Sequence, residues 1–302
     1  MSNYGESHLY NIADIRFRIE TPFAYEESAA FLPFVCADAP AAAAGESETA
    51  VRFRFHAVEC RRTPPIASEG ELRIYEEGDT VYREFHCGDQ PPHACTVYRR
   101  GQQGCECRLY PGGERYAVST QNIFQLIGFE WLLCAQDALI LHAACIRCNG
   151  RGILFTASSG TGKSTQADLW VTHHGAELLN GDRGILRRRE GVWRAYGSPY
   201  AGSSQVHKQD SVPIRAIVRL YQAPENRVKR LTGLEAFCAI YPHMTVNSWD
   251  AWFVDRSITM TEDIINRVPV YELHCRPDRE ATEVLAALLD SEDAANGQKG
   301  GA

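Results

Sequence analysis

One glycine- and lysine-containing segment carries the clearest chemical signal in the sequence. The segment ASSGTGKST fits the P-loop pattern G-x-x-x-x-G-K-[ST], with Ala157 in place of the first glycine. Gly160 and Gly162 allow the backbone to bend tightly, so that successive N–H groups face a phosphate. Lys163 can reach β- and γ-phosphate oxygens, and the Ser164 hydroxyl can ligate Mg²⁺. The segment predicts a site for ATP and Mg²⁺ that is built from Ser159, Gly160, Thr161, Gly162, Lys163, Ser164 and Thr165.

A carboxylate and a histidine could act beside this segment. Asp182 follows a strand predicted for residues 176–180, which we expect to neighbour the strand before the P-loop. A carboxylate at that strand end can meet Mg²⁺ or accept the proton of an attacking hydroxyl. The alternative is an aspartate that only stabilises a turn between two glycines. His142 lies within an apolar strand, so the alternative for it is a core histidine without a catalytic role.

Hydrophobic patterns place these residues in an alternation of strands and helices. Residues 152–157 predict a strand directly before the P-loop, and residues 166–173 predict a helix directly after it. Upstream, residues 121–136 predict one buried helix and residues 138–145 a strand. The dipeptide Asn149-Gly150 predicts a hairpin turn. A strand before the loop and a helix after it are the context that the P-loop pattern requires.

The first third of the chain has a different pattern of apolar and polar residues. Residues 15–20 and 51–57 alternate apolar with polar residues, which is the period of a half-buried strand. The change near Ser119 predicts a β-rich N-terminal part over residues 1–120 and a nucleotide-binding core over 121–290. Residues 291–302 are small and polar, which predicts a disordered tail.

Composition excludes several classes of protein. The chain has 302 residues, of which 44% are hydrophobic and 23% are charged, as in an ordinary globular protein. The net charge is 31 − 38 = −7, which argues against binding to nucleic-acid phosphates. No apolar run approaches the roughly 18 residues of a membrane span, and the N-terminus lacks a secretory signal pattern. We therefore expect a cytoplasmic protein without membrane or nucleic-acid partners, whose eleven cysteines are reduced.

Cysteine and histidine spacing gives weaker signals. Cys145 and Cys148 form a C-x-x-C on a predicted strand, where residues i and i+3 point to opposite faces. A zinc set with unusual loop spacing could be made by His86, Cys87, His93 and Cys95. Structural thiols are the preferred interpretation of both patterns.

A polar group follows the strand predicted for residues 214–221. It consists of Asn226, Arg227 and Arg230. One of these arginines could reach the γ-phosphate as an internal arginine finger. A solvated surface is the alternative and the preferred interpretation.

The order of these motifs resembles a known family. The sequence resembles the kinase core of HPr kinase/phosphorylase in the order of its elements: a strand with Leu-His, a hairpin, a strand, the S-G-x-G-K-S loop, a helix and a short strand ending in aspartate. This order is also similar to that of the nucleotide-binding core of phosphoenolpyruvate carboxykinases. The resemblance covers residues 138–186 and extends loosely to about residue 290. It implies an α/β fold with a P-loop kinase core of this type beside the β-rich N-terminal part.

The resemblance carries over to only some residues. The family histidine falls on His142, and Asp182 matches one member of an acidic pair whose other member is absent. The resemblance thus implies Asp182, His142 and Lys163 as catalytic residues, with Asp182 as the base toward a serine hydroxyl. The family's RGLG-type signature with its metal-binding glutamate is also missing, because residues 196–200 contain no acid. Metal binding would then depend on Ser164, Asp182 and water.

The function that this implies is transfer of the γ-phosphate of ATP to a hydroxyl. Kinase-like relatives of this core occur beside ribosomal peptide pathways, so the acceptor could be a serine of a peptide or protein, or a small alcohol. Relatives of the HPr kinase type assemble into rings, which implies a homo-oligomer. A nucleotide-responsive binding protein without phosphoryl transfer remains the alternative, because the second acid and the glutamate are missing. A motor or transporter NTPase is disfavoured, since no LSGGQ-like signature is present.

Overall fold

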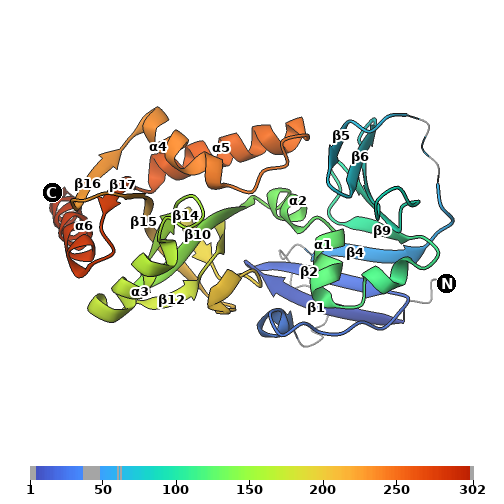
Figure 1. Cartoon of the computed structure of the whole chain (residues 1–302), viewed down its shortest axis with the longest axis horizontal. Coiled ribbons are helices and arrows are strands. Elements are labelled where there is room, and N and C mark those ends of the chain that lie inside the picture. Colours follow the sequence, from blue (N-terminus) through green and yellow to red (C-terminus); the bar gives the residue numbers. More distant parts are fainter. Residues whose placement is uncertain (1–4, 37–47, 60, 62, 300–302) are drawn as a thin grey trace. The chain divides into compact units, whose positions relative to one another are not determined.

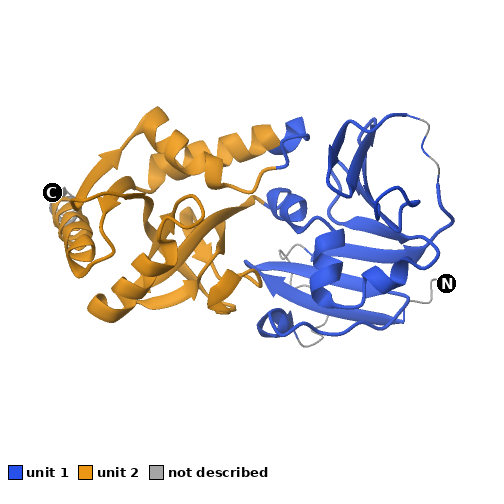
Figure 2. Cartoon of the chain, in the orientation of Figure 1, with its two compact units in different colours: residues 1–136, 247–253 blue, residues 137–246, 254–302 orange. Residues whose placement is uncertain are grey.

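The computed structural model describes residues 5–36, 48–59, 61 and 63–299. The chain divides into two compact units (Figure 2), one of residues 1–136 with 247–253 and the other of residues 137–246 with 254–302. Each unit combines a large sheet with helices, so the fold is mixed α/β (Figure 1). The composition predicts a boundary near residue 120, whereas the units divide after Gln136.

The first unit is built on one nine-stranded sheet of the order β3-β1-β2-β4-β9-β8-β7-β6-β5. The β-rich character predicted for this part is confirmed. Its strands are β1 Glu6–Ile12, β2 Ile15–Thr21, β3 Val35–Cys36, β4 Glu48–Phe55, β5 Ala67–Glu69, β6 Leu72–Glu77, β7 Thr80–Phe85, β8 Ala94–Arg99 and β9 Cys105–Leu109. The β2–β4 and β4–β9 pairs are parallel, and the others are antiparallel. Its helices are η1 Leu32–Phe34, η2 Gly113–Tyr116, α1 Thr120–Leu126 and α2 Phe129–Cys134.

The single helix predicted for residues 121–136 is in fact two helices, α1 and α2. Gly128 separates them with φ of 60°, a left-handed conformation that suits glycine. A Cβ at this position would lie 1.6 Å from Nη1 of Arg83 and 2.0 Å from the hydroxyl of Tyr98. The break allows aromatic residues of both helices to reach the sheet: Phe17 packs edge-on against Phe124 and Phe129.

The second unit contains the elements that the P-loop pattern predicts. Its strands are β10 Ala138–Cys148, β11 Arg151–Thr156, β12 Glu177–Asn180, β13 Arg183–Arg189, β14 Val192–Tyr196, β15 Ser211–Gln222, β16 Arg227–Leu231 and β17 Val270–Cys275. Its helices are α3 Lys163–His174, η3 Gly202–Ser204, α4 Gly233–Ile240, η4 Tyr241–His243, the part of α5 (Ala251–Arg267) from Val254 on, and α6 Arg279–Lys299. The turn at Asn149 and Gly150 has positive φ at both residues, as the Asn-Gly hairpin predicts.

Two long strands organise this unit. The first half of β10 pairs with β13, and its second half pairs with β11 on one side and β12 on the other. The start of β15 pairs with β14, and the rest pairs with β11 and β17. The strands β11, β15 and β17 are mutually parallel. Their carboxyl ends therefore meet at one edge, the usual place for a ligand in an open α/β sheet.

Helices α3 and α6 cover one face of this sheet. Trp170 of α3 and Leu285 of α6 are fully buried against apolar side chains of β11, such as Phe155. The predicted strands 152–157 and 176–180 and the predicted helix after the loop are confirmed within a residue or a few at their ends. Among the described residues, no helix is long and apolar enough to cross a membrane.

The predicted disordered tail is helical as far as the structure describes it. Residues 291–299 continue α6, and residues 300–302 lie outside the described part. Charged groups anchor this end of the helix to the sheet. Asp293 pairs with Arg151 and Arg215, and Glu292 accepts a hydrogen bond from the hydroxyl of Tyr271. Composition misses these pairs because their partners lie far away in the sequence.

Candidate functional site

The glycine- and lysine-containing segment forms a loop, residues 158–162, between β11 and α3. Gly160 and Gly162 have φ of 77° and 116°, which non-glycine residues rarely adopt. The chain can thus turn sharply and begin α3 at Lys163. The Lys163 side chain is buried and folds back over the loop, where Nζ donates to the carbonyl oxygen of Ala157 at 3.1 Å. Backbone N–H groups at the start of a helix and one lysine ammonium therefore converge on this loop.

His142 and Asp182 meet beside this loop. The Nε2 atom of His142 lies 3.0 Å from Oδ1 of Asp182. His142 sits on β10 where its pairing with β13 ends, and the following residue, Ala143, donates its N–H to the carbonyl of Asp182 at 2.8 Å. The pairing of β10 thus brings together two residues that the sequence analysis singled out separately.

The predicted neighbourhood of Asp182 needs one correction. The strand that precedes Asp182, β12, was expected to lie beside β11, but it pairs with β10. Since β10 also pairs with β11, it lies between the two strands. The reason is that β10 is long enough to pair with β13 and β12 in succession along one edge. Asp182 still reaches the site, because it follows β12 directly and borders His142.

A buried asparagine holds Asp182 in place. Asn180 is fully buried, and its Oδ1 accepts hydrogen bonds from the backbone N–H groups of Asp182 and Arg183 at 3.0 and 2.8 Å. Its Nδ2 donates to the carbonyl oxygens of Ser198 and Tyr200, both at 3.3 Å. The asparagine therefore ties the turn of Asp182 to the segment after β14.

A close glycine contact shapes the other side of Asp182. A Cβ added to Gly202 would lie 2.8 Å from Cβ of Asp182. Gly202 also has φ of 56°, so this position requires glycine both for its conformation and for its proximity to the carboxylate. Gly202, the first residue of η3, thus borders the candidate base.

The environment of the site lowers the pKa of two of these groups, Lys163 and His142. Burial lowers the pKa of Lys163; Asp182 opposes this effect and Arg219 adds to it. Burial, followed by the positive charge of Lys163, lowers the pKa of His142 against the effect of Asp182. His142 is therefore neutral near pH 7 and can donate its Nε2 proton to the carboxylate.

A hollow of about 420 Å³ opens beside the loop. Its wall combines loop backbone, the start of α3 and the ends of β15 and β17. The lining residues are Gly160, Thr161, Gly162, Thr165, Gln166, Leu220, Gln222, Ala223, Cys275, Arg276 and Pro277. Gln166 is buried, and its Oε1 has no hydrogen-bond partner among the described residues. An unused acceptor in a partly apolar hollow suits a ligand that carries N–H groups.

The residues suited to Mg²⁺ are oxygen donors. Ser164 is exposed in the first turn of α3, and Asp182 is one-third exposed beside Lys163. Mg²⁺ prefers hard oxygen ligands and usually keeps several waters besides phosphate oxygens. A hydroxyl and one carboxylate therefore fit a metal that is held mainly by a nucleotide.

The candidate arginine finger is not joined to this site. Arg230 pairs with Glu292 of α6 at 2.7 Å, and Arg227 is exposed on β16. Asn226 donates to the carboxylates of Asp278 and Glu280. Arg230 thus fastens β16 to α6, and Asn226, directly before β16, fastens this part of the chain to α6 and the loop before it.

The candidate zinc set is engaged in other contacts. The ring nitrogens of His86 lie near the carbonyl of Gln90 and the carboxylate of Glu84, and His93 stacks on Tyr116 with ring centroids 3.9 Å apart. Burial raises the pKa of Cys95 to about 12, which disfavours the thiolate that zinc requires. Among the described residues, no group of three or more histidine, cysteine or acidic side chains is arranged to hold a metal.

The cysteines of the C-x-x-C pattern behave as buried apolar side chains. Both lie on β10; Cys148 belongs to the cluster under α3 and α6, whereas Cys145 does not. Burial raises the pKa of Cys145 to about 12 and also raises that of Cys148. The described cysteines form no disulfide; they are Cys36, Cys87, Cys95, Cys105, Cys107, Cys134, Cys145, Cys148, Cys238 and Cys275.

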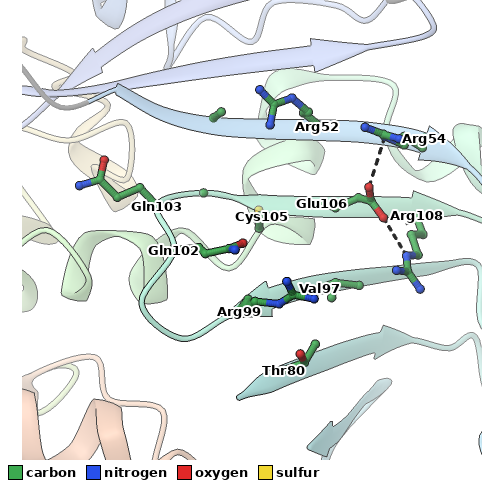
Figure 3. A pocket seen from close by; sticks show the side chains of 12 residues that line it. Arg52, Arg54, Thr80, Val97, Arg99, Gln102, Gln103, Cys105, Glu106 and Arg108 are labelled. Atoms are coloured by element: carbon green, nitrogen blue, oxygen red, sulfur yellow. Dashed lines mark hydrogen bonds and ion pairs between the residues drawn. The ribbon is translucent and has the colours of Figure 1, made fainter. Parts of the chain in front are cut away.

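The first unit has a polar hollow of its own, of about 320 Å³ (Figure 3). Arg54 of the neighbouring strand β4 reaches Glu106 at 3.2 Å, and Arg108 reaches it from the same strand, β9, at 2.9 Å. Arg52 pairs with Glu20 at 2.9 Å. The arginines of this sheet face are therefore largely compensated by carboxylates. The hollow shows no acid–base arrangement comparable to that of the second unit.

Sequence reasoning misses three residues that surround the site. Asn180 positions Asp182, as described above. Arg219 of β15 adds positive charge that lowers the pKa of Lys163, and His243 of η4 adds a second imidazole, whose pKa Arg219 and Lys163 both lower. Only the alternation of Arg219 with apolar neighbours on a predicted strand could have drawn attention to it.

Comparison with known proteins places the chain in a family. Residues 122–277 match the family model described as SynChlorMet cassette protein ScmC. No curated protein matches the chain. Among solved structures, the Hpr(Ser) kinase/phosphatase from Coxiella burnetii matches with 12% identity and a TM-score of 0.32, over 52% of this chain and 96% of that chain. Because the family model spans more than half of the chain, the protein belongs to the family of the SynChlorMet cassette protein ScmC.

Proposed function

We propose that this protein is an ATP-dependent phosphotransferase that passes the γ-phosphoryl group to a hydroxyl. The observation that carries the proposal is the hydrogen-bonded pair of His142 and Asp182, 3.0 Å apart and electrostatically coupled to Lys163. A carboxylate oriented by a neutral imidazole is suited to accept the proton of an attacking hydroxyl. A lysine ammonium in a glycine loop is suited to bind the phosphates of the donor.

In this proposal the loop and α3 hold the nucleotide. Backbone N–H groups of residues 160–165 face the phosphates, and Lys163 exchanges the carbonyl of Ala157 for phosphate oxygens. The hollow beside the loop takes the nucleoside, with Gln166 as a hydrogen-bond acceptor. Ser164 and Asp182 would hold Mg²⁺. When bound, the metal neutralises phosphate charge.

The transfer step uses the residues at the carboxyl ends of the strands. The acceptor oxygen forms a bond to the γ-phosphorus while the bond from this phosphorus to the β–γ bridging oxygen breaks. The bridging oxygen keeps the electron pair and leaves with ADP. The acceptor proton passes to a carboxylate oxygen of Asp182. His142 holds that carboxylate through its Nε2 proton, so its role is to position the base.

The proposed acceptor is a serine of a peptide or protein, or a small alcohol. A carboxylate base suits a neutral hydroxyl, since only one proton must be removed during an otherwise electrostatically driven transfer. The start of η3, where Gly202 lies close to Asp182, would border this hydroxyl.

One observation favours a second candidate, a nucleotide-responsive binding protein that transfers no phosphate. The Nε atom of Arg183 lies 3.7 Å from Oδ2 of Asp182, where the resemblance implies a second acid. Arginine thus places positive charge where the resemblance implies a second carboxylate, and the site lacks the acidic pair. Nucleotide binding would remain intact under this alternative, whereas transfer would be lost.

A transfer assay separates the two candidates. The wild type is incubated with γ-labelled ATP and Mg²⁺, with serine-containing peptides, free serine and small alcohols as acceptors. The proposal expects label in one acceptor class and an equal amount of ADP. Calorimetry on the same sample gives the affinity for ATP. Tight binding without label transfer and without ADP in any acceptor mixture would support the binding protein instead.

A further inference from the structure

Arg219 lies at the same strand edge as the loop. In the parallel pair of β11 and β15, Arg219 is the register partner of Thr156, the last residue of β11. The loop, residues 158–162, begins two residues after Thr156. Further along β15, Nε2 of Gln222 donates to the carbonyl of Thr161 in the loop at 3.4 Å. The end of β15 therefore borders the loop along its length, and Arg219 stands at the beginning of this border.

The Arg219 guanidinium is held in place, but two of its three nitrogens are unused. Nε and Nη1 are buried and have no hydrogen-bond partner among the described residues. The guanidinium carbon lies 5.4 Å from the ring centroid of Tyr221, which stacks on His274 at 4.7 Å. The aromatic stack fixes the side chain from one side. Buried donors without acceptors cost stability, so an acceptor from outside the chain would complete this site.

A second segment approaches from η4. Met244 forms a bridge with Leu141 of β10, and Thr245 donates its N–H to the carbonyl of Ile140 at 2.9 Å. These contacts hold Met244, the residue after His243, against Leu141, the residue before His142 on β10. Elements distant in sequence thus bring a second imidazole to the carboxyl ends of the strands.

Positive charge gathers here without enough negative charge to balance it. Burial lowers the pKa of His243 to about 4, and Arg219, His142 and Lys163 contribute to this shift in that order. Two carboxylates lie nearby: Asp182, which is engaged with His142, and Glu272 of β17, the register partner of Arg219, which lies 3.5 Å from His274. Among the described residues, neither Lys163 nor Arg219 forms an ion pair with a carboxylate, although the two cations act on each other. A site of this kind is complementary to a small oxyanion with several acceptor oxygens.

We propose that Arg219 forms a second phosphate-binding subsite and contacts the oxygens of the transferred γ-phosphoryl group. This inference rests on the proposed phosphotransferase function. Lys163 binds the phosphates from the loop, and Arg219 supplies two further nitrogens from β15. Arg219 keeps its proton throughout, while the bond changes and the proton transfer to Asp182 proceed as described above. Arg219 thus takes the role that Arg227 and Arg230 cannot fill.

The test compares Arg219→Gln and Arg219→Lys with Arg227→Gln, an exposed arginine of β16, as the matched control. Calorimetry with Mg²⁺ measures the affinities for ATP and for ADP, and label transfer is measured at saturating ATP. For Arg219→Gln we expect ATP affinity to fall about tenfold with ADP affinity unchanged, because ADP lacks the γ-phosphate. The transfer rate should fall about 10³–10⁵-fold, the usual effect of losing an arginine at the γ-phosphoryl group. The Lys variant should recover ATP affinity but only a small part of the rate.

Each remaining outcome decides the inference. If the wild type transfers no phosphate but Arg219→Gln still loses its preference for ATP over ADP, the proposed function fails and the subsite stands. Equal losses for ATP and ADP would overturn the subsite, as would an unchanged preference. If Arg219→Gln does not fold, Arg219→Lys decides: wild-type rate and wild-type ATP preference in that variant would show that no planar, two-nitrogen contact is made.

Discussion

His142 and Asp182 form a pair that contributes little to stability. Their Nε2 and Oδ1 atoms are 3.0 Å apart, yet the two side chains are 37% and 33% exposed. Pairs this accessible to solvent are typically worth no more than about 1 kcal/mol. The pair is nevertheless enforced by a long strand pairing and by the buried Asn180. An arrangement that requires a buried polar network to hold it, but contributes little to stability, is typical of a functional site.

The first prediction concerns Asp182→Asn. The amide keeps the size and most hydrogen bonds of the carboxylate but loses its charge and basicity. We expect transfer to fall about 10²–10⁴-fold, the usual contribution of a general base, with nearly normal affinity for ATP. Label transfer and calorimetry measure the two quantities. A metal role would in addition shift the dependence of the rate on Mg²⁺ concentration.

A structural role of Asp182 would give the opposite pattern. The variant would then melt at a lower temperature and transfer phosphate at the wild-type rate. Asp263→Asn is a useful control, because Asp263 pairs with Arg267 and Trp193 on the same unit. Its loss should affect the melting temperature more than the transfer rate.

The second prediction concerns Lys163→Ala. A charge-assisted hydrogen bond to phosphate is worth about 1.5–3 kcal/mol, so ATP affinity should fall roughly 10- to 150-fold. Lys229→Ala is the control, since Lys229 is exposed on β16 and pairs with Glu235. Calorimetry on the three proteins checks the expectation. Equal ATP affinity in wild type and Lys163→Ala would remove the loop from the nucleotide site.

The loop and its flanking elements could be predicted because their determinants are local. Gly160 and Gly162 adopt positive φ, which their lack of a side chain already suggests, and Lys163 follows them directly. The Asn149–Gly150 turn is predictable for the same reason. The division of residues 121–136 into two helices is not local, since it depends on the contact of Gly128 with the first sheet.

The surroundings of the loop depend on strand register. His142 meets Asp182 only because β10 pairs with β13 and then with β12. Arg219 approaches the site only because β15 is parallel to β11 and shares its register. An isolated arginine in a strand has no sequence pattern that distinguishes an anion site from a solvated position. Whether such an arginine lies at an anion site depends on long-range strand pairing, which composition and periodicity do not reveal.

The third prediction concerns Asn180, whose side chain joins four backbone groups. Asn180→Asp keeps the acceptor for Asp182 and Arg183 but replaces the donor to Ser198 and Tyr200 with a second oxygen. A buried, unpaired charge would result, and removal of such a network costs about 1–3 kcal/mol or more. We expect a lower melting temperature and slower transfer together, measured by thermal melting and label transfer. Unchanged values of both would contradict a positioning role.

The fourth prediction concerns the cysteines. Burial raises the pKa of Cys95, Cys107 and Cys145 to about 12, so these thiols are protonated and poorly reactive near pH 7. We expect native mass spectrometry to find no stoichiometric zinc, and a reducing agent to leave the melting temperature unchanged. Alkylation of the folded protein should modify the exposed Cys87 and Cys238 first. One equivalent of zinc would revive the cluster of His86 and His93 with its cysteines.

The last prediction is a dependence of stability on pH that His243 causes. The pKa of His243 is about 4 in the folded protein, because burial and the charges of Arg219, His142 and Lys163 disfavour its protonation. In the unfolded chain its pKa is near the ordinary value of about 6.5. Between these two values the unfolded chain binds more protons than the folded chain, so lowering the pH favours unfolding. The melting temperature should therefore fall as the pH is lowered from 7 to 4.5.

His243→Gln cannot take up this proton and should show a smaller fall, whereas His173→Gln, which changes an exposed histidine of α3, should follow the wild type. The fall will not vanish in His243→Gln, since the pKa of His142 is lowered as well. Parallel curves for wild type and His243→Gln would show that His243 does not lie among these cations in solution.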